Sequence, residues 1–331
     1  MSEQMPAEQG RFRLEEGPDS PYLDRLRDVD FTPVFILGLH RSGTSILYKM
    51  MRSTGRFNGV TTYHITHYNE LLRNHVEERQ RQAKQELNEL LRQENHRDRG
   101  IDNLTMEADL PLEYAFLLGK NYLFNQLTRD NIDVFVELCK KIQYIGDSAK
   151  PLLLKNPWDF ANFMFIKKRL PRAQFVFIHR NPLAVINSSI RALRVLVNED
   201  TVYSELISPL ARDAVNNPVL SLVGKTLLHP RFPLGLAIVV EHRAAYTRYF
   251  LDNIGRLDDS DYVNIRYEDL CHATETTMQA VFDHLDMRDI DAGRFTSYIN
   301  PRDLSLSRDV ARLQGYIQKR FARYRAMFGY D

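Results

Sequence analysis

The sequence contains little cysteine and almost no excess charge. Its 331 residues include two cysteines, Cys139 and Cys271, which have neither the spacing of a metal site nor that of a redox pair. We therefore predict two reduced thiols and no disulfide, as is typical of a cytoplasmic protein. Basic and acidic side chains number 44 and 43, and the net charge of +1 argues against nucleic acid or a membrane surface as a partner.

Long apolar runs and targeting signals are also missing. The longest apolar runs, such as residues 234–240, are far too short to span a bilayer. Residues 1–17 are polar and of mixed charge, which fits neither a signal peptide nor a transit peptide. These features predict a cytoplasmic globular enzyme without a membrane anchor. We expect residues 1–30 to form a flexible arm and residues 31–331 to form a single domain.

A glycine-containing turn near the N-terminus lacks the lysine of a nucleotide-binding P-loop. Residues 33–51 read PVFILGLHRSGTSILYKMM, an apolar run, a turn and the start of an amphipathic helix. The spacing is that of the loop G-x-x-x-x-G-K-[S/T], but Thr44 replaces the lysine that holds the β- and γ-phosphates of a nucleoside triphosphate. The cation of this turn is Arg41 instead. Backbone N–H groups at such a strand-to-helix turn still form an anion site, which the helix dipole strengthens.

Short apolar runs separated by helical segments predict the fold. Strands are expected at Val34–Leu37, Leu152–Leu154, Phe175–Ile178 and Tyr262–Ile265. This alternation indicates an α/β protein with a three-layer, P-loop-like architecture, in which helices flank a central parallel sheet. Mainly helical segments at 102–150 and 195–255 are predicted to form the substrate pocket. The charged stretch 76–99 is interpreted as a helical insertion, either an interaction arm or a lid.

A second basic turn follows the third predicted strand. Arg180 stands at the carboxyl end of that strand, where open α/β sheets bind ligands. Ser188 lies on the helix that follows, so its hydroxyl can meet a phosphate that Arg180 also holds. The alternative is that Arg180 pairs with an acidic neighbour and that Ser188 is solvated. Two such turns at the carboxyl ends of parallel strands predict a ligand with two separated phosphate groups.

Taken together, these motifs resemble the sulfotransferases that use 3′-phosphoadenosine-5′-phosphosulfate (PAPS). Arg180 followed eight residues later by Ser188 is similar to their 3′-phosphate element, and Tyr267 of the YEDL segment resembles a tyrosine near the adenine. Lys155, in LLLKNP, matches a lysine near the transferred sulfuryl group in the tyrosylprotein and bacterial branches. Five consecutive residues are similar to the 5′-phosphosulfate loop: Arg41, Ser42, Gly43, Thr44 and Ser45.

The resemblance implies in-line transfer of the sulfuryl group from PAPS to a hydroxyl or amine of a small-molecule acceptor. The products would be the sulfated acceptor and 3′,5′-adenosine bisphosphate, and no metal ion would be required. Arg41, Lys155 and the loop N–H groups would stabilise charge on the leaving phosphate oxygen. The Thr44 and Ser45 hydroxyls would donate hydrogen bonds to the 5′-phosphate.

A hydroxyl acceptor also needs a general base. Related bacterial sequences resemble this chain with a glutamate about 23 residues after the loop arginine, and here that position is His64. Imidazole is a competent base near neutral pH, so His64 is the predicted base, with His67 and Glu70 as the other candidates. The C-terminal segment would close over the cofactor, as a loop does in similar enzymes. Its candidates are Arg302, Ser305 and Ser307.

Two other functions stay open at this point. A P-loop kinase would need a lysine at position 44 and an acidic magnesium ligand at a strand end, but Asp159 and Asp269 lie beyond the strands. A non-catalytic module that binds a phosphorylated ligand would need no base. A metal site at His64 and His67 lacks further nearby ligands. The sequence leaves open which acceptor is used (sugar, phenol, lipid, peptide or alkaloid), whether the product is an O- or N-sulfate, and whether the protein forms a homodimer.

Overall fold

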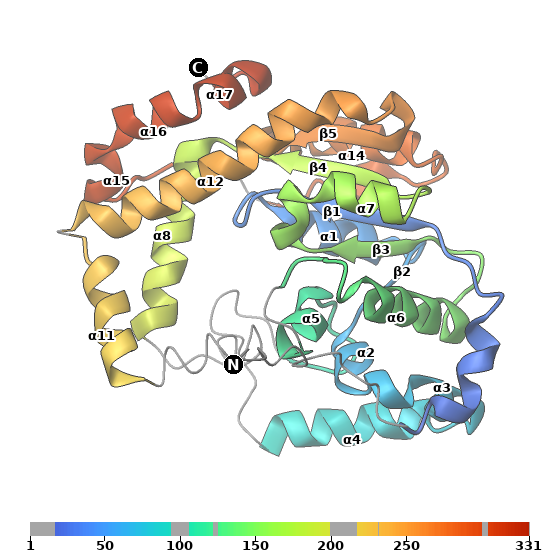
Figure 1. Cartoon of the computed structure of the whole chain (residues 1–331). Helices are drawn as coiled ribbons and strands as arrows, with labels where there is room; N and C mark the ends of the chain where they lie inside the picture. Colours follow the sequence, from blue (N-terminus) through green and yellow to red (C-terminus); the bar gives the residue numbers. More distant parts are fainter. Residues whose placement is uncertain are drawn as a thin grey trace, which may run out of the picture.

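The computed structural model describes residues 17–93, 106–121, 125–198, 217–230, 232–299 and 304–330. A parallel sheet lies at the centre with the strand order β2-β3-β1-β4-β5 (Figure 1). The strands are β1 Pro33–Leu37, β2 Asn58–Gly59, β3 Leu152–Lys155, β4 Gln174–His179 and β5 Tyr262–Arg266. All four predicted strands are confirmed to within a residue at each end. The short edge strand β2 was missed because it offers no apolar run.

Helices cover both faces of the sheet, so the predicted three-layer architecture is confirmed (Figure 1). Every residue of β1 and β3 is buried, and side chains alternate between the two faces, as the strand period of two requires. Phe35 and Phe175 face one layer, which includes α6 Ile132–Ile145, α7 Phe163–Arg169 and the 3-10 helix η3 Pro157–Ala161. Ile36 and Val176 face the other, which includes α1 Thr44–Ser53 and α14 Thr274–His284.

The remaining helices surround these layers. On the side of β2 lie α2 Thr62–Thr66, α3 Leu71–Val76, α4 Gln80–Gln93 and α5 Ala115–Asn121. Beside the carboxyl end of β4, at the left of Figure 1, lie α8 Pro182–Asn198, α11 Pro218–Leu227 and α12 Pro233–Asn253. The C-terminal part comprises α13 Tyr267–His272, α15 Arg308–Arg312, α16 Gln314–Arg320 and α17 Ala322–Phe328. Within the described ranges, no helix combines the length and the hydropathy needed to cross a membrane.

Part of the expected N-terminal arm is packed against the body of the protein. Residues 20–26 form the 3-10 helix η1 Ser20–Leu26, and Asp19 is buried. Lys141 on α6 reaches Asp19 at 2.9 Å and also pairs with Glu137. Within the expected arm over 1–30, this buried ion pair holds the residues around Asp19 against α6; residues 1–16 lie outside the described residues.

Two helical segments differ from what their sequence patterns suggest. The charged stretch 76–99 contains α4, whose Ala83 and Leu87 are buried while Leu90 is exposed; residues 94–99 lie outside the described ranges. The basic C-terminal pattern would fit one long helix, but the chain forms three short ones that break at Leu313 and Phe321. Gly329 ends the last of them in the left-handed conformation, as a C-terminal cap does.

A buried histidine joins the C-terminal helices to the end of β4. His179 is fully buried, and its ring stacks on Phe328 at 3.7 Å. Its Nδ1 lies 2.8 Å from the Tyr324 hydroxyl and its Nε2 lies 2.9 Å from Asn264 Oδ1. The Asn264 carbonyl oxygen can only accept, so the neutral ring donates from Nε2 and accepts at Nδ1. This network fixes the strand end that precedes Arg180.

We predict that acid destabilises the fold through such buried histidines. Burial lowers the pKa of His179 from 6.5 to about 3, and the same holds for His64. Between pH 6.5 and 3 the unfolded chain therefore binds more protons than the native one, so stability is complete above pH 6.5 and falls below it. Lowering the pH from 6.5 to 5 should cost about 2 kcal/mol of unfolding free energy per histidine. Urea unfolding across this range measures the slope. His179→Gln should remove one histidine's share of it, and an unchanged slope in that variant would contradict the assignment.

Candidate active site

The first turn joins β1 to α1 through a strained backbone. Arg41 has a φ of 71° and Gly43 a φ of 105°, so two of three consecutive residues adopt positive φ. A Cβ added at Gly43 would lie 2.4 Å from a ring carbon of Tyr267, so only glycine fits here. The turn thus packs directly on Tyr267, the residue that the family resemblance implies to lie near the adenine. Its backbone also opens α1, since the Leu47 N–H donates to the Gly43 carbonyl at 3.2 Å.

Lys155 lies at the same edge of the sheet, beside the first turn. It is opposite Ile36 in the parallel pairing of β3 with β1, which brings its side chain toward the start of α1. Its Nζ donates to the Ser45 hydroxyl at 2.9 Å and pairs with Glu113 Oε1 at 2.8 Å. Both partners of the ion pair are buried, with exposed fractions of 5% for Lys155 and 7% for Glu113. The predicted lysine therefore touches the predicted loop.

Glu113 was not among the residues predicted from the sequence. It precedes α5 and stands 72 residues after Arg41 in the chain, in a segment where no motif marked it. The only available signal was a carboxylate within an apolar stretch, PLEYAFLL, because buried carboxylates need a partner. Its partner could not be named without knowing that the loop before α5 lies beside the carboxyl end of β3.

The second turn converges on the first. Arg180 follows β4, and its Nη1 donates to the Arg41 carbonyl at 2.9 Å. Its guanidinium lies 4.1 Å from the centre of the Tyr267 ring, a cation–π contact. The Arg41 Nε donates in turn to the Ser188 hydroxyl on α8 at 3.0 Å. Four residues chosen from separate motifs thus form one contiguous group.

This group opens on a pocket of about 340 Å³. The residues that line it include Arg180, Ser188, Tyr267, Arg191 and Ser305. The Arg191 guanidinium donates a hydrogen bond to the Ser305 carbonyl at 3.0 Å. Within the described part of the chain, neither Arg41 nor Arg180 forms an ion pair with a carboxylate, so the proposed pairing of Arg180 with an acidic neighbour is not seen. Both guanidinium groups are available to an anionic ligand.

Glu268 holds the second turn in place. Its Oε1 accepts from the Asn181 N–H at 2.9 Å, and its Oε2 accepts from the Tyr330 hydroxyl at 3.0 Å. The Asn181 side chain caps α8 by accepting from the Leu183 N–H at 2.9 Å. The carboxylate therefore ties the start of α8 to both α13 and the C-terminal residues.

His64 lies outside this group of residues, and its hydrogen bonds stabilise the start of a helix. It is buried in α2, where Nδ1 accepts from the Thr61 N–H at 3.1 Å and completes a capping box. A further hydrogen bond joins its ring to the Gly59 backbone, and burial lowers its pKa to about 3, which makes it a weak base. The charges that act on the ring belong to Lys84, Arg52 and Asp109. Its role as the base stays a prediction, and the geometry favours capping.

The other predicted candidates are spread over the molecule. His67 contacts the Thr66 hydroxyl at 2.9 Å, and Glu70 pairs with Arg73 at 2.8 Å. The Ser305 segment does lie over the pocket, where Asn187 on α8 donates to its carbonyl, while the Ser307 N–H donates to the same asparagine. Arg302 lies outside the described residues.

Asp159, considered above as a possible magnesium ligand of a kinase, has a structural role. Asp159 is fully buried and accepts from the Tyr114 hydroxyl at 2.6 Å and from the Leu127 N–H at 2.9 Å. Asn156 and Asn162 also donate to it. Among the described residues, no cluster of three or more histidine, cysteine or acidic side chains could hold a metal ion.

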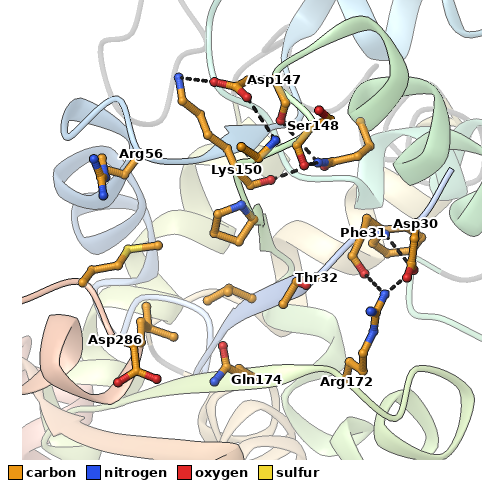
Figure 2. Close-up of a pocket in the computed structure, with 16 residues that line it drawn as sticks. Asp30, Phe31, Thr32, Arg56, Asp147, Ser148, Lys150, Arg172, Gln174 and Asp286 are labelled. Carbon is orange, nitrogen blue, oxygen red and sulfur yellow. Dashed lines mark hydrogen bonds and ion pairs between the residues drawn. The ribbon is translucent and has the colours of Figure 1, made fainter.

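A larger cavity of about 610 Å³ lies at the opposite, amino edge of the sheet (Figure 2). Its cations are already paired: Arg172 contacts Asp30 and the Phe31 carbonyl, Lys150 contacts Asp147 at 3.4 Å, and Arg56 contacts Asp289 at 3.2 Å. Because these groups neutralise one another at the surface, the cavity lacks the free cations of the carboxyl edge.

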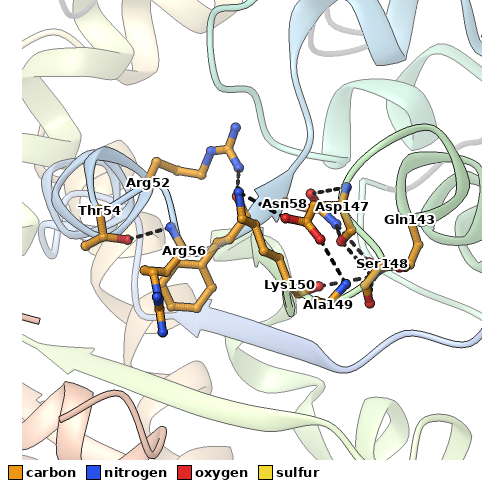
Figure 3. A network of polar contacts seen from close by, with 10 residues as sticks. Arg52, Thr54, Arg56, Asn58, Gln143, Asp147, Ser148, Ala149 and Lys150 are labelled. Carbon is orange, nitrogen blue, oxygen red and sulfur yellow. Dashed lines mark hydrogen bonds and ion pairs between the residues drawn. The ribbon is translucent and has the colours of Figure 1, made fainter. Parts of the chain in front are cut away.

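The wall of that cavity is a polar network that closes the sheet edge (Figure 3). Asn58 of β2 donates to Gln143 Oε1 at 3.1 Å and to the Asp147 carbonyl at 2.8 Å. Gln143 donates to the Ser148 and Lys150 carbonyls, both at 3.0 Å. These side chains satisfy backbone groups of the turn between α6 and β3, which is a structural role.

The parallel sheet, the glycine turn that opens α1 and the flanking helices place the chain in the P-loop-like α/β class. The profile of the sulfotransferase family matches residues 33–291, so the chain belongs to this family. No curated protein matches the sequence significantly.

Two solved bacterial sulfotransferases have a similar fold. STF1 from Mycobacterium tuberculosis is 15% identical, with a TM-score of 0.59 over 92% of this chain and 80% of that one. STF9 from Mycobacterium avium is 13% identical, with a TM-score of 0.61 over 93% of this chain and 79% of that one. At such identities the likeness concerns the fold.

Proposed function

We propose that the protein transfers the sulfuryl group of PAPS to a hydroxyl or amine of a small-molecule acceptor. The observation that carries this proposal is the contact of two separate basic turns at one edge of the sheet, through Arg41, Ser188 and Arg180. A donor with a 5′-phosphosulfate and a 3′-phosphate needs two anion sites on either side of an adenosine. The pocket beside Arg180 and Tyr267 supports the 3′-phosphate and adenine, and the first turn supports the 5′-phosphosulfate.

The reaction would be an in-line displacement at sulfur. The acceptor oxygen or nitrogen forms a bond to sulfur while the bond from sulfur to the bridging phosphate oxygen breaks, which releases the bisphosphate. The loop N–H groups, Arg41 and the Lys155 ammonium stabilise the negative charge that develops on the leaving oxygen. The Thr44 and Ser45 hydroxyls donate to the 5′-phosphate. The proton of the acceptor passes to a general base, and no metal ion takes part.

Glu113 is the base that the geometry supports. Its ion pair with Lys155 brings a carboxylate next to the side chain that contacts the phosphosulfate loop. A base has to lie within hydrogen-bond reach of the acceptor proton, and a group beside the sulfuryl position meets this requirement better than a capping histidine on α2. His64 is retained as the alternative, and the two are separated by substitution.

Calorimetric titration with 3′,5′-adenosine bisphosphate, without magnesium, tests the proposal. We expect binding, because both turns would be occupied by phosphate groups. A parallel titration with ATP and magnesium should show weak or no binding, since Thr44 replaces the P-loop lysine. Binding of ATP without binding of the bisphosphate would instead support a kinase. If the bisphosphate binds, mass spectrometry of acceptor mixtures incubated with PAPS would identify the product by its added sulfuryl group.

A further inference from the structure

A half-buried cation on α12 has no carboxylate partner among the described residues. Arg243 lies on α12 and is half-buried, and its Nε is buried without a hydrogen-bond partner. Its guanidinium contacts the neighbouring His242, with 3.5 Å between Nη1 and the ring Nδ1. Among the described residues no carboxylate pairs with it, and desolvation lowers its pKa to about 10.

Three other buried or partly buried cations have carboxylate partners. Lys141 pairs with Asp19 and Glu137, Lys155 pairs with Glu113, and Arg194 pairs with Asp309. A guanidinium that is partly removed from water and unpaired is costly, so an anion that neutralises it would be bound favourably.

A second nitrogen without a hydrogen-bond partner belongs to the first turn, on a ring that the charge of Arg243 reaches. His40, the residue before Arg41 in the first turn, has a fully buried Nε2 with no hydrogen-bond partner. Its ring is held edge-on to Trp158 of η3, with 4.5 Å between ring centres, and α12 packs against η3. After burial, the causes that lower the pKa of His40 are the charges of Arg243, His242, Lys155 and Arg41. All of these groups are basic, so the field around this ring is positive and an anion would be attracted to it.

We propose that the Arg243 guanidinium, together with His40, binds an anionic group of the acceptor, such as a carboxylate or a phosphate. This inference rests on the proposed function. The donor is held by the two turns, whereas Arg243 belongs to α12, in the helical part beside the turns. The guanidinium fork can donate two hydrogen bonds to such a group, and a neutral His40 protonated at Nε2 can donate a third. The acceptor would therefore be a hydroxy acid or a phosphorylated alcohol or amine, and not a neutral phenol.

Inorganic sulfate serves as the probe for this site. The melting temperature is measured for the protein saturated with PAPS, because PAPS would fill the two turns and the sulfuryl position. Sodium sulfate then replaces sodium chloride stepwise at constant ionic strength. Sulfate should stabilise the wild type in a saturable manner. Because hydrogen bonds to charged groups contribute about 1.5–3 kcal/mol, Arg243→Gln should weaken the apparent sulfate affinity at least about tenfold. Arg243→Lys, which keeps the charge, should retain part of the effect. Arg248→Gln, on an exposed residue of the same helix, should behave like the wild type.

Three outcomes would overturn the inference or its basis. A sulfate effect that is equal in Arg243→Gln and in the wild type would exclude an anion site at Arg243. A sulfate effect seen with the bisphosphate bound but absent with PAPS bound would assign Arg243 to the sulfuryl group of the donor and not to the acceptor. Failure of the bisphosphate to bind, seen in the titration above before any sulfate is added, would overturn the proposed function instead.

Discussion

Glu113→Gln and Lys155→Met should each lower turnover by about 100- to 1000-fold, the usual effect of removing one preorganised catalytic group. Glutamine keeps the shape of Glu113 but accepts no proton, and methionine keeps the stem of Lys155 but not its charge. Because the two side chains act as one unit, the double variant should be less impaired than the product of the single effects. Single-turnover transfer from PAPS at saturating donor measures this loss, and bisphosphate titration shows whether the donor site survives.

The control for this prediction separates chemistry from stability. Breaking a buried ion pair typically costs about 3–5 kcal/mol, so both variants should also unfold more easily. Lys141→Met breaks a comparably buried ion cluster on α6, with Asp19 and Glu137, far from the turns. It should lose stability without losing turnover per folded molecule. If Glu113→Gln retains turnover while His64→Gln loses it, the base is His64 and the capping interpretation is incomplete.

Arg180→Ala should abolish the preference for a 3′-phosphate. We expect affinity for 3′,5′-adenosine bisphosphate to fall about 10- to 100-fold, because a hydrogen bond to a charged group contributes about 1.5–3 kcal/mol. Affinity for adenosine 5′-monophosphate, which lacks the 3′-phosphate, should change much less. Calorimetry with both nucleotides measures the two affinities and therefore their ratio.

Arg172→Ala supplies the matched control for Arg180. Arg172 is an exposed arginine, whereas Arg180 is half-buried; Arg172 lies at the opposite edge of the sheet and contacts Asp30. Its substitution should leave both nucleotide affinities unchanged. A parallel loss of both affinities in Arg180→Ala would indicate that the residue supports the turn through the Arg41 carbonyl and Tyr267, and not by contact with a 3′-phosphate.

Local sequence signals were sufficient for the strands and the two turns. Buried parallel strands require apolar runs such as VFIL and FVFI, and turns that open helices require glycine, asparagine and proline at set positions, as at Gly43 and Asn181. These constraints act within a few residues, so they can be recognised in the chain. The short strand β2 and the breaks at Leu313 and Phe321 carry no such signal, because packing against distant elements and not a local pattern defines them.

The pairing of distant side chains was decided by the tertiary structure. The sequence by itself determined a P-loop-like sheet, the two basic turns at Arg41 and Arg180, and a lysine at the end of the second predicted strand. Only the fold brought Glu113 to Lys155, left Arg243 without a carboxylate partner among the described residues, and placed His64 in a capping box. Charge compensation and burial depend on which segments meet across the sheet, and contacts between residues separated by tens of positions leave no local signal in a single sequence.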